Sequence, residues 1–113
     1  MSDPWPTELV LDPAKTTLTV RFDNGDAFAL KAEYLRVESP SAEVQGHNPS
    51  QKQIVTGKED VTITGLEPVG NYAVRIIFDD GHDTGLYSWD YLRQLGREQP
   101  VRWAAYRKAA GIA

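Results

Sequence analysis

Alternating apolar and polar residues predict a β-hairpin near the N-terminus. Between residues 17 and 22 every second position is apolar, the pattern of a strand with one buried face. Asn24-Gly25 follows and predicts a type I′ turn, because both residues tolerate positive φ. Residues 28–30 return as the second strand, and residues 8–11 are expected to form a further strand.

A second group of strands is predicted in the middle of the chain. Apolar residues alternate with threonines over residues 61–66, a turn is expected at 68–71, and the alternation resumes over 72–78. Residues 38–58, between the two groups, are rich in Ser, Pro, Gly, Gln and Asn. This composition predicts a long flexible loop within one domain.

Helices are expected in two regions. Residues 32–37 fit a short helix after the first hairpin. Ser88 is a suitable N-cap for a helix over 89–95, and Gly96 is a natural end for it. Pro100 favours the first position of a second helix, over residues 100–110.

These elements predict a single α+β domain over residues 1–113. We expect an antiparallel sheet of about five or six strands with two or three helices, the last two contiguous at the C-terminus. The strands come in runs without regular strand–helix–strand alternation, which argues against a doubly wound fold. The predicted core consists of Leu18, Val20, Phe22, Leu35, Val74, Ile76, Phe78, Leu86 and Leu92.

One strand–turn–helix motif occurs in two copies along the chain, which predicts an internal pseudo-repeat. The copies are offset by 56 positions at the turn and by 57 at the Tyr-Leu-Arg element. They differ after the turn, where the second copy has a Gly-His-Asp-Thr-Gly run. The first copy is Phe22-Asp23-Asn24-Gly25, Leu30 and Tyr34-Leu35-Arg36, and the second is Phe78-Asp79-Asp80-Gly81, Leu86 and Tyr91-Leu92-Arg93.

Composition narrows the classes of function. The chain has 113 residues, 41% of them hydrophobic, and no cysteine, which excludes disulfides, thiolate metal sites and a cysteine nucleophile. The N-terminus lacks the basic and apolar regions of a signal peptide, and no apolar stretch approaches the ~20 residues that span a bilayer. We therefore expect a cytoplasmic protein.

Charge is unevenly distributed. Residues 88–113 carry +3, whereas the whole chain carries −4, so the remainder carries −7. A basic C-terminal helix could contact nucleic acid or an acidic partner. The alternative that we favour is a solvated helix face, because five basic residues are sparse beside a nucleic-acid footprint.

Candidate chemistry centres on the second turn, where residues 79–83 contain three carboxylates and His82. They suggest either a metal or acid–base site or, as we favour, a polar hairpin turn. The one distant partner that the sequence offers is His47, in the predicted loop. The serines lack an activating elbow motif, and the glycines match neither a P-loop nor a dinucleotide fingerprint.

The second half is rich in aromatic residues. Most of them are expected to pack in the core, but Tyr87 or Trp89 facing outward would be an anchor for a partner. The candidate interaction surface therefore comprises His82, Asp83, Tyr87, Trp89 and His47.

Residues 66–74, followed by the run from Phe78 to Trp89 and by Tyr91-Leu92, resemble a bacterial family of unknown function. That family is similar to the N-terminal domain of gamma-butyrobetaine hydroxylase. Its members occur alone, beside iron–sulfur carrier ATPases, or ahead of a 2-oxoglutarate oxygenase domain. The resemblance covers residues 8–95, and the Gly-His-x-x-Gly-x-Tyr-Ser-Trp run is quite specific to the family.

The resemblance implies a structural zinc site that this sequence lacks. In hydroxylase-type members a Cys-Pro-Cys-x-x-Cys segment joins the histidine of the turn. The matching positions here are Ser39, Ser41 and Val44, so only His82 survives as a ligand. We therefore expect no zinc and no other cofactor. We also expect no oxygenase domain, so we do not expect the hydroxylase activity.

Two hypotheses of different class follow. The first is a non-catalytic interaction or adaptor domain, not an enzyme, which assists a metalloenzyme or an iron–sulfur related protein partner. The second is a small-ligand or metal-binding domain that uses His82, Asp83 and His47. We expect no membrane partner and no nucleic acid.

Overall fold

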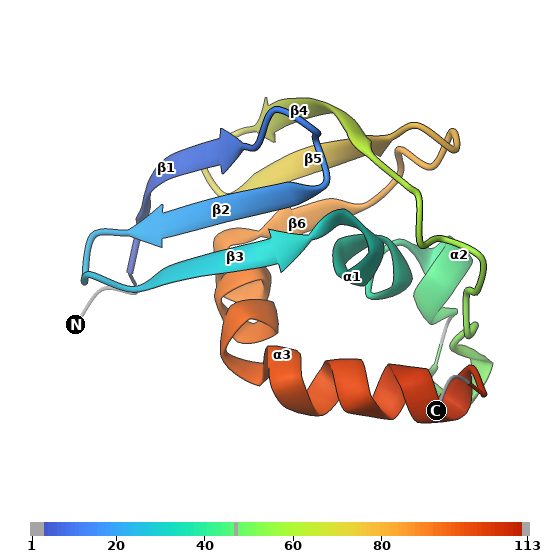
Figure 1. The fold of residues 1–113 in the computed structure, drawn as a ribbon. Helices are drawn as coiled ribbons and strands as arrows, with labels where there is room; N and C mark the ends of the chain where they lie inside the picture. Colours follow the sequence, from blue (N-terminus) through green and yellow to red (C-terminus); the bar gives the residue numbers. More distant parts are fainter. Residues whose placement is uncertain (1–3, 47, 112–113) are drawn as a thin grey trace.

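The described residues form two separate three-stranded antiparallel sheets (Figure 1). A computed structural model describes residues 4–46 and 48–111. The first sheet has the order β1-β2-β3 and the second β4-β5-β6. Their bounds are Pro6–Leu11 for β1, Thr17–Phe22 for β2, Ala27–Lys31 for β3, Ile63–Val69 for β4, Ala73–Phe78 for β5 and Leu86–Ser88 for β6.

The predicted α+β class is confirmed, but the single sheet of five or six strands is wrong. Alternation of apolar residues predicts that a strand exists, whereas edge pairing depends on how the hairpins meet in space. A backbone hydrogen bond from Ile63 N to Lys15 O, 2.9 Å long, links the start of β4 to the loop before β2.

Both sheets contribute to one hydrophobic core. Leu18 and Val20 of β2, Val74 and Ile76 of β5, and residues of the helices belong to one cluster of buried side chains. Eight of the nine predicted core residues are buried. Leu86 is the exception, at 42% exposed, because in β6 the neighbouring Tyr87 points inward and adjacent strand residues face opposite ways.

The first hairpin turn is not type I′. Gly25 has φ of 93°, but Asn24 is not among the described non-glycine residues with positive φ. Phe22 N donates to Asp26 O at 2.8 Å, and the Asn24 side chain accepts from Asp26 N at 2.9 Å. The loop is therefore a three-residue hairpin connection that ends in a glycine bulge.

The second hairpin turn has equivalent hydrogen bonds. Phe78 N donates to His82 O at 3.0 Å and Gly81 N donates to Phe78 O at 3.2 Å, while Gly81 has φ of 90°. The side chain of Asp80 accepts from His82 N, as Asn24 accepts in the first turn. The backbone of residues 22–26 is thus repeated at residues 78–82.

The two Tyr-Leu-Arg elements also make reciprocal contacts. The hydroxyl of Tyr34 donates to the Leu95 carbonyl at 2.7 Å, and that of Tyr91 donates to the Glu38 carbonyl at 2.6 Å. The two donors, Tyr34 and Tyr91, are 57 positions apart, and so are the two acceptors, Glu38 and Leu95. Each tyrosine therefore donates to the carbonyl that lies four residues after the other tyrosine.

The helices comprise α1 (Ala32–Val37), α2 (Ala42–Gln45), the 3-10 helix η1 (Pro49–Gln51) and α3 (Trp89–Ala109). The bounds of α1 match the prediction. By contrast, α2 and η1 lie within the segment predicted to be a loop, and Ser41 caps α2 by accepting from Glu43 N. None of the helices described is long and apolar enough to cross a membrane.

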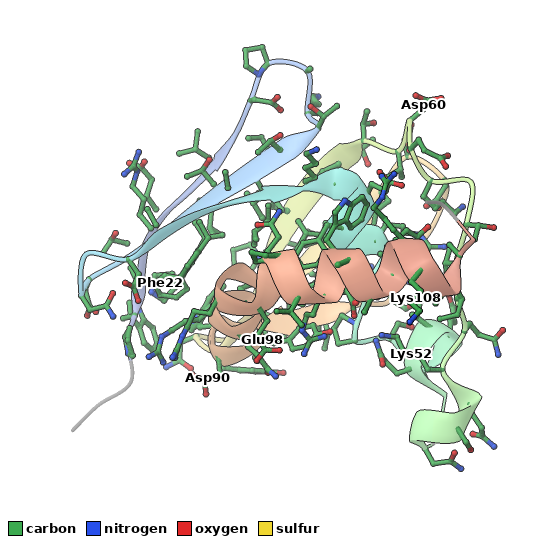
Figure 2. All side chains as sticks on the ribbon, turned by 60° about the horizontal axis from the view of Figure 1, so that its bottom comes forward. Phe22, Lys52, Asp60, Asp90, Glu98 and Lys108 are labelled. Atoms are coloured by element: carbon green, nitrogen blue, oxygen red, sulfur yellow. The ribbon has the colours of Figure 1, made fainter. Side chains whose placement is uncertain are left out.

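The two predicted C-terminal helices are one continuous helix. Gly96 does not end α3; a Cβ there would overlap the Phe28 ring of β3, so the glycine permits close packing of the helix on the first sheet. Pro100 cannot donate to the Gly96 carbonyl, and α3 changes direction in this region (Figure 1). Figure 2 shows Asp90 and Glu98 in the first half of α3 and Lys108 near its end.

Candidate functional site

The structure brings together the positions that match the zinc ligands of hydroxylase-type members. Ser39 follows α1, Ser41 and Val44 belong to the α2 region, and His82 comes from the β5–β6 hairpin. Ser39 Oγ lies 2.8 Å from His82 Nε2, and Ser41 Oγ lies 2.7 Å from Thr84 Oγ1. Hydrogen bonds therefore join these segments where the family pattern has metal ligands.

His82 is the centre of this network. Its side chain is 3% exposed, and its Nδ1 lies 3.1 Å from Glu43 Oε2. Burial, and secondarily the nearby Arg36 guanidinium, lower the pKa of the imidazole, although Glu43 opposes the shift. The neutral ring can donate to one neighbour and accept from the other.

Gly85 makes the close approach possible. A Cβ at this position would lie 2.6 Å from Ser39 Oγ. Gly85, the second glycine of the Gly-His-x-x-Gly run, is thus needed for contact with Ser39. The sequence pattern shows that a glycine stands at this position, but only the structure gives the reason.

The donor set does not fit zinc. Serine hydroxyls and the methyl groups of Val44, which is 1% exposed, cannot replace thiolates. In the part of the chain that is described, no group of three or more His, Asp or Glu side chains could hold a metal ion. His82 and Asp83 also diverge, because the imidazole faces Ser39 whereas Asp83 Oδ2 lies 3.4 Å from Arg75.

The hydrogen bonds of His82 link a serine on one side to a carboxylate on the other, as in a catalytic triad of nucleophile, base and orienting carboxylate. The serine is Ser39 and the carboxylate is that of Glu43. This order alone does not make a hydrolytic site. Ser39 is 0% exposed, and its Oγ already accepts from Ser41 N at 3.2 Å. A substrate carbonyl cannot reach the hydroxyl in this arrangement, so the network acts to hold residues 39–46 against the hairpin.

An ion cluster beside the network holds the turn in place. Asp80 Oδ2 lies 2.8 Å from Arg36 Nε and 2.6 Å from Lys58 Nζ. Burial opposes ionisation, but these two cations and the backbone N–H of His82 bring the pKa of Asp80 well below its ordinary value. The cluster is not evident in the sequence, because its members are separated by up to 44 positions.

The remaining predicted surface residues separate into two classes. Tyr87 is 0% exposed and its hydroxyl donates to Leu35 O at 2.5 Å, so placing it on the surface was wrong. Burial raises its pKa. His82 is also buried, whereas the Asp83 side chain is 48% exposed. His47 lies outside the described residues.

Trp89 borders an aromatic surface that the sequence did not reveal. Its Nε1 donates to Asn71 O at 2.9 Å, which orients the indole. Trp5 and Tyr72 are 49% and 55% exposed and line the same hollow of about 380 Å³. We name Trp5, Tyr72 and Trp89 the aromatic surface.

Comparison with known proteins identifies the family. The model of the N-terminal domain of gamma-butyrobetaine hydroxylase-like proteins matches residues 9–93. The chain belongs to this family. A search among curated proteins found no match.

Several solved structures are also similar to this chain. A protein of unknown function from Acidithiobacillus ferrooxidans, placed in the DUF971 family, is 41% identical with a TM-score of 0.71. The match covers 84% of this chain and 98% of that one. Two structures solved by NMR are 46% and 47% identical, with TM-scores of 0.80 and 0.81. They cover 97% and 99% of this chain, and 89% and 86% of their own lengths.

Proposed function

We propose that this family member is a non-catalytic interaction domain whose partner binds the aromatic surface. The supporting observation is the exposure of Trp5 and Tyr72 beside Trp89 around one hollow. Tryptophan and tyrosine are enriched among the residues that dominate interface energies. The partner proposed is a protein, in the cytoplasm, of the metalloenzyme or iron–sulfur class that the family resemblance implies.

Affinity purification with matched variants tests this proposal. Tyr72→Ala combined with Trp5→Ala should lose a partner that the unmodified chain retains. Val10→Ala is the control, since Val10 is 43% exposed outside the aromatic surface. The same partner profile for all three chains would reject the proposal.

We also propose that the two strand–turn–helix units are structural repeats. Support comes from the equivalent hydrogen bonds of the two turns and from the reciprocal bonds of Tyr34 and Tyr91. The second unit then differs in function, because it carries His82 and one side of the aromatic surface.

A further inference from the structure

Hydrogen bonds fix the residues of the aromatic surface in place. Trp5 N donates to Asp23 Oδ1 at 3.1 Å, and the Trp5 carbonyl accepts from Asp23 N at 2.8 Å. The Tyr72 carbonyl accepts from Trp89 N at 3.2 Å, and the Trp89 indole donates to Asn71 O at 2.9 Å. The surface is therefore largely preorganised, which lowers the entropic cost of binding a ligand.

The aromatic surface offers π-systems on which no cation of its own lies. The electron-rich faces of tryptophan and tyrosine attract cations. Among the described residues that line the hollow, none is a lysine or an arginine. The cation–π contact between described residues, that of Arg102 over Tyr91 at 5.9 Å, involves a different ring. The exposed rings of Trp5 and Tyr72 are thus available to a cation from outside the chain.

Two carboxylates accompany these rings. Asp90 is exposed and lines the same hollow, and the Asp23 carboxylate contacts Trp5 N. Neither carboxylate takes part in an ion pair between described residues. Arg93, one turn after Asp90 along α3, lies 4.0 Å from Asp26 instead. The described lining of the hollow therefore carries a charge of −1, which favours a cationic ligand.

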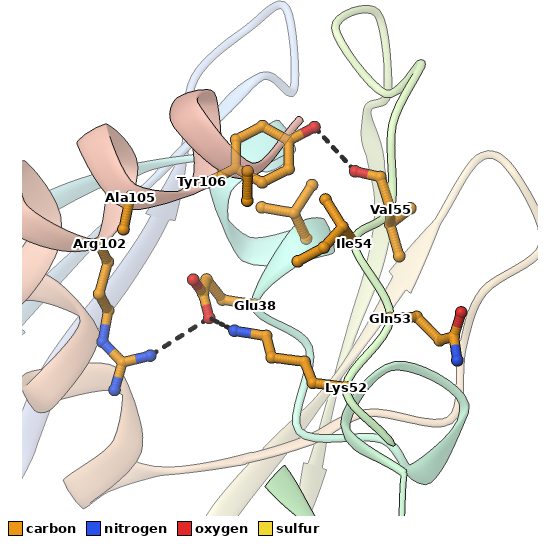
Figure 3. A pocket seen from close by; sticks show the side chains of 10 residues that line it. Glu38, Lys52, Gln53, Ile54, Val55, Arg102, Ala105 and Tyr106 are labelled. Atoms are coloured by element: carbon orange, nitrogen blue, oxygen red, sulfur yellow. Dashed lines mark hydrogen bonds and ion pairs between the residues drawn. The ribbon is translucent and has the colours of Figure 1, made fainter. Parts of the chain in front are cut away.

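A second hollow, beside residues 52–55, lacks such an excess of charge (Figure 3). Glu38 Oε2 lies 3.0 Å from Lys52 Nζ and 3.2 Å from Arg102 Nη1. Arg102 is also paired with Glu98 at 2.9 Å. Two cations and two carboxylates balance there, so the excess charge distinguishes the hollow at the aromatic surface.

We propose that the aromatic surface binds the side chain of an exposed arginine, which the protein partner supplies; this inference rests on the proposed function. The planar guanidinium stacks on an exposed ring while its N–H groups donate to the Asp90 carboxylate. Arginine suits both contacts better than lysine, because its flat, weakly hydrated cation stacks on aromatic rings and forms parallel hydrogen bonds to a carboxylate. An anion is disfavoured, because it would meet the carboxylate of Asp90.

An acetylated and amidated Gly-Arg-Gly peptide is the probe. The matched control is the same peptide with citrulline, which has nearly the shape of arginine without its charge. In ¹H–¹⁵N NMR titrations at low salt, the arginine peptide should give saturable shifts at the indole N–H groups of Trp5 and Trp89. The citrulline peptide should bind roughly fivefold more weakly. Equal affinity of the two peptides, or no saturable shifts at tens of millimolar arginine peptide, would overturn the proposal.

Matched variants locate the binding. Asp90→Asn should raise the Kd of the arginine peptide about fivefold, whereas Asp60→Asn, an exposed carboxylate far from Asp90, should leave it unchanged (Figure 2). Tyr72→Leu removes a ring and should also weaken binding, and Tyr72→Phe, which keeps the ring, should not. An unchanged Kd in a folded Asp90→Asn or Tyr72→Leu chain would contradict the proposal.

Affinity purification with Asp90→Asn separates failure of this inference from failure of the proposed function. A partner that is lost with Trp5→Ala and Tyr72→Ala but fully retained by Asp90→Asn would leave the interaction domain standing and reject arginine recognition. If no partner depends on the aromatic surface although the arginine peptide binds as expected, the arginine site stands and the proposed function fails.

Discussion

Ser39 Oγ lies 2.8 Å from His82 Nε2 although 43 positions separate the two residues. The contact joins the end of α1 to the second hairpin turn at the place where hydroxylase-type members carry zinc. A hydrogen bond contributes about 1 kcal/mol, whereas a structural zinc ion contributes roughly ten times more. The junction in this chain is therefore weaker, but it needs neither a metal nor reduced thiols.

Removing the Ser39 hydroxyl should destabilise the fold. Ser39→Ala leaves His82 Nε2 and Ser41 N without their buried partner, so we expect the free energy of unfolding to fall by about 1–3 kcal/mol. Urea denaturation measures this change. Thr56→Ala, at an exposed position, is the control and should have almost no effect.

Cysteines at positions 39, 41 and 44 should create a zinc site. The Ser39→Cys, Ser41→Cys, Val44→Cys chain then supplies three thiolates next to His82, the ligand set of a closed tetrahedral site. We expect about one bound zinc per chain, measured by metal analysis, and a raised Tm with zinc. Adding His82→Ala should weaken zinc binding. Equal zinc binding with and without His82 would show that the imidazole is not a ligand.

Stability should fall as the pH is lowered below the ordinary His pKa of 6.5. Because burial lowers the pKa of His82 in the folded chain, the unfolded chain binds more protons in this range, and stability rises with pH. Denaturant titrations at several pH values measure the slope, which should decrease in His82→Gln. His47→Gln controls for the other histidine, and an unaltered slope in His82→Gln would contradict the assignment.

Gly96→Ala should destabilise the protein even though alanine favours helices. The added Cβ overlaps the Phe28 ring, which outweighs a helix propensity gain of about 1 kcal/mol. We expect a net loss of about 1–2 kcal/mol in the free energy of unfolding. In a Phe28→Ala background the same change should become neutral or stabilising, which a double-mutant cycle tests.

The reciprocal tyrosine bonds should have similar strengths. Tyr34→Phe and Tyr91→Phe each remove one hydroxyl donor to a backbone carbonyl, so each should cost about 1–2 kcal/mol. Thermal unfolding compares them with Tyr72→Phe, whose side chain is 55% exposed. A large effect in one variant and none in the other would count against equivalent roles for the two helices.

Much of the local structure could be predicted from the sequence, because its causes are local. Period-two alternation over residues 17–22 and 73–78 reflects strands with one buried face, and α1 has the bounds predicted. The buried face of the short strand β6 was predicted incorrectly. The strand buries Tyr87 instead of Leu86, and a shift of one residue exchanges the two faces of a strand. The family could also be assigned from the residues around His82.

Sequence alone determined that the zinc ligands are missing, since the residue types at positions 39, 41 and 44 decide it. Only the tertiary structure decided what replaces them, because the Ser39–His82 and Ser41–Thr84 contacts join segments 43 positions apart. It also decided that Gly96 serves packing on Phe28 rather than helix termination. Local propensity describes a residue and its neighbours along the chain, whereas burial and pairing depend on which segments meet in the folded molecule.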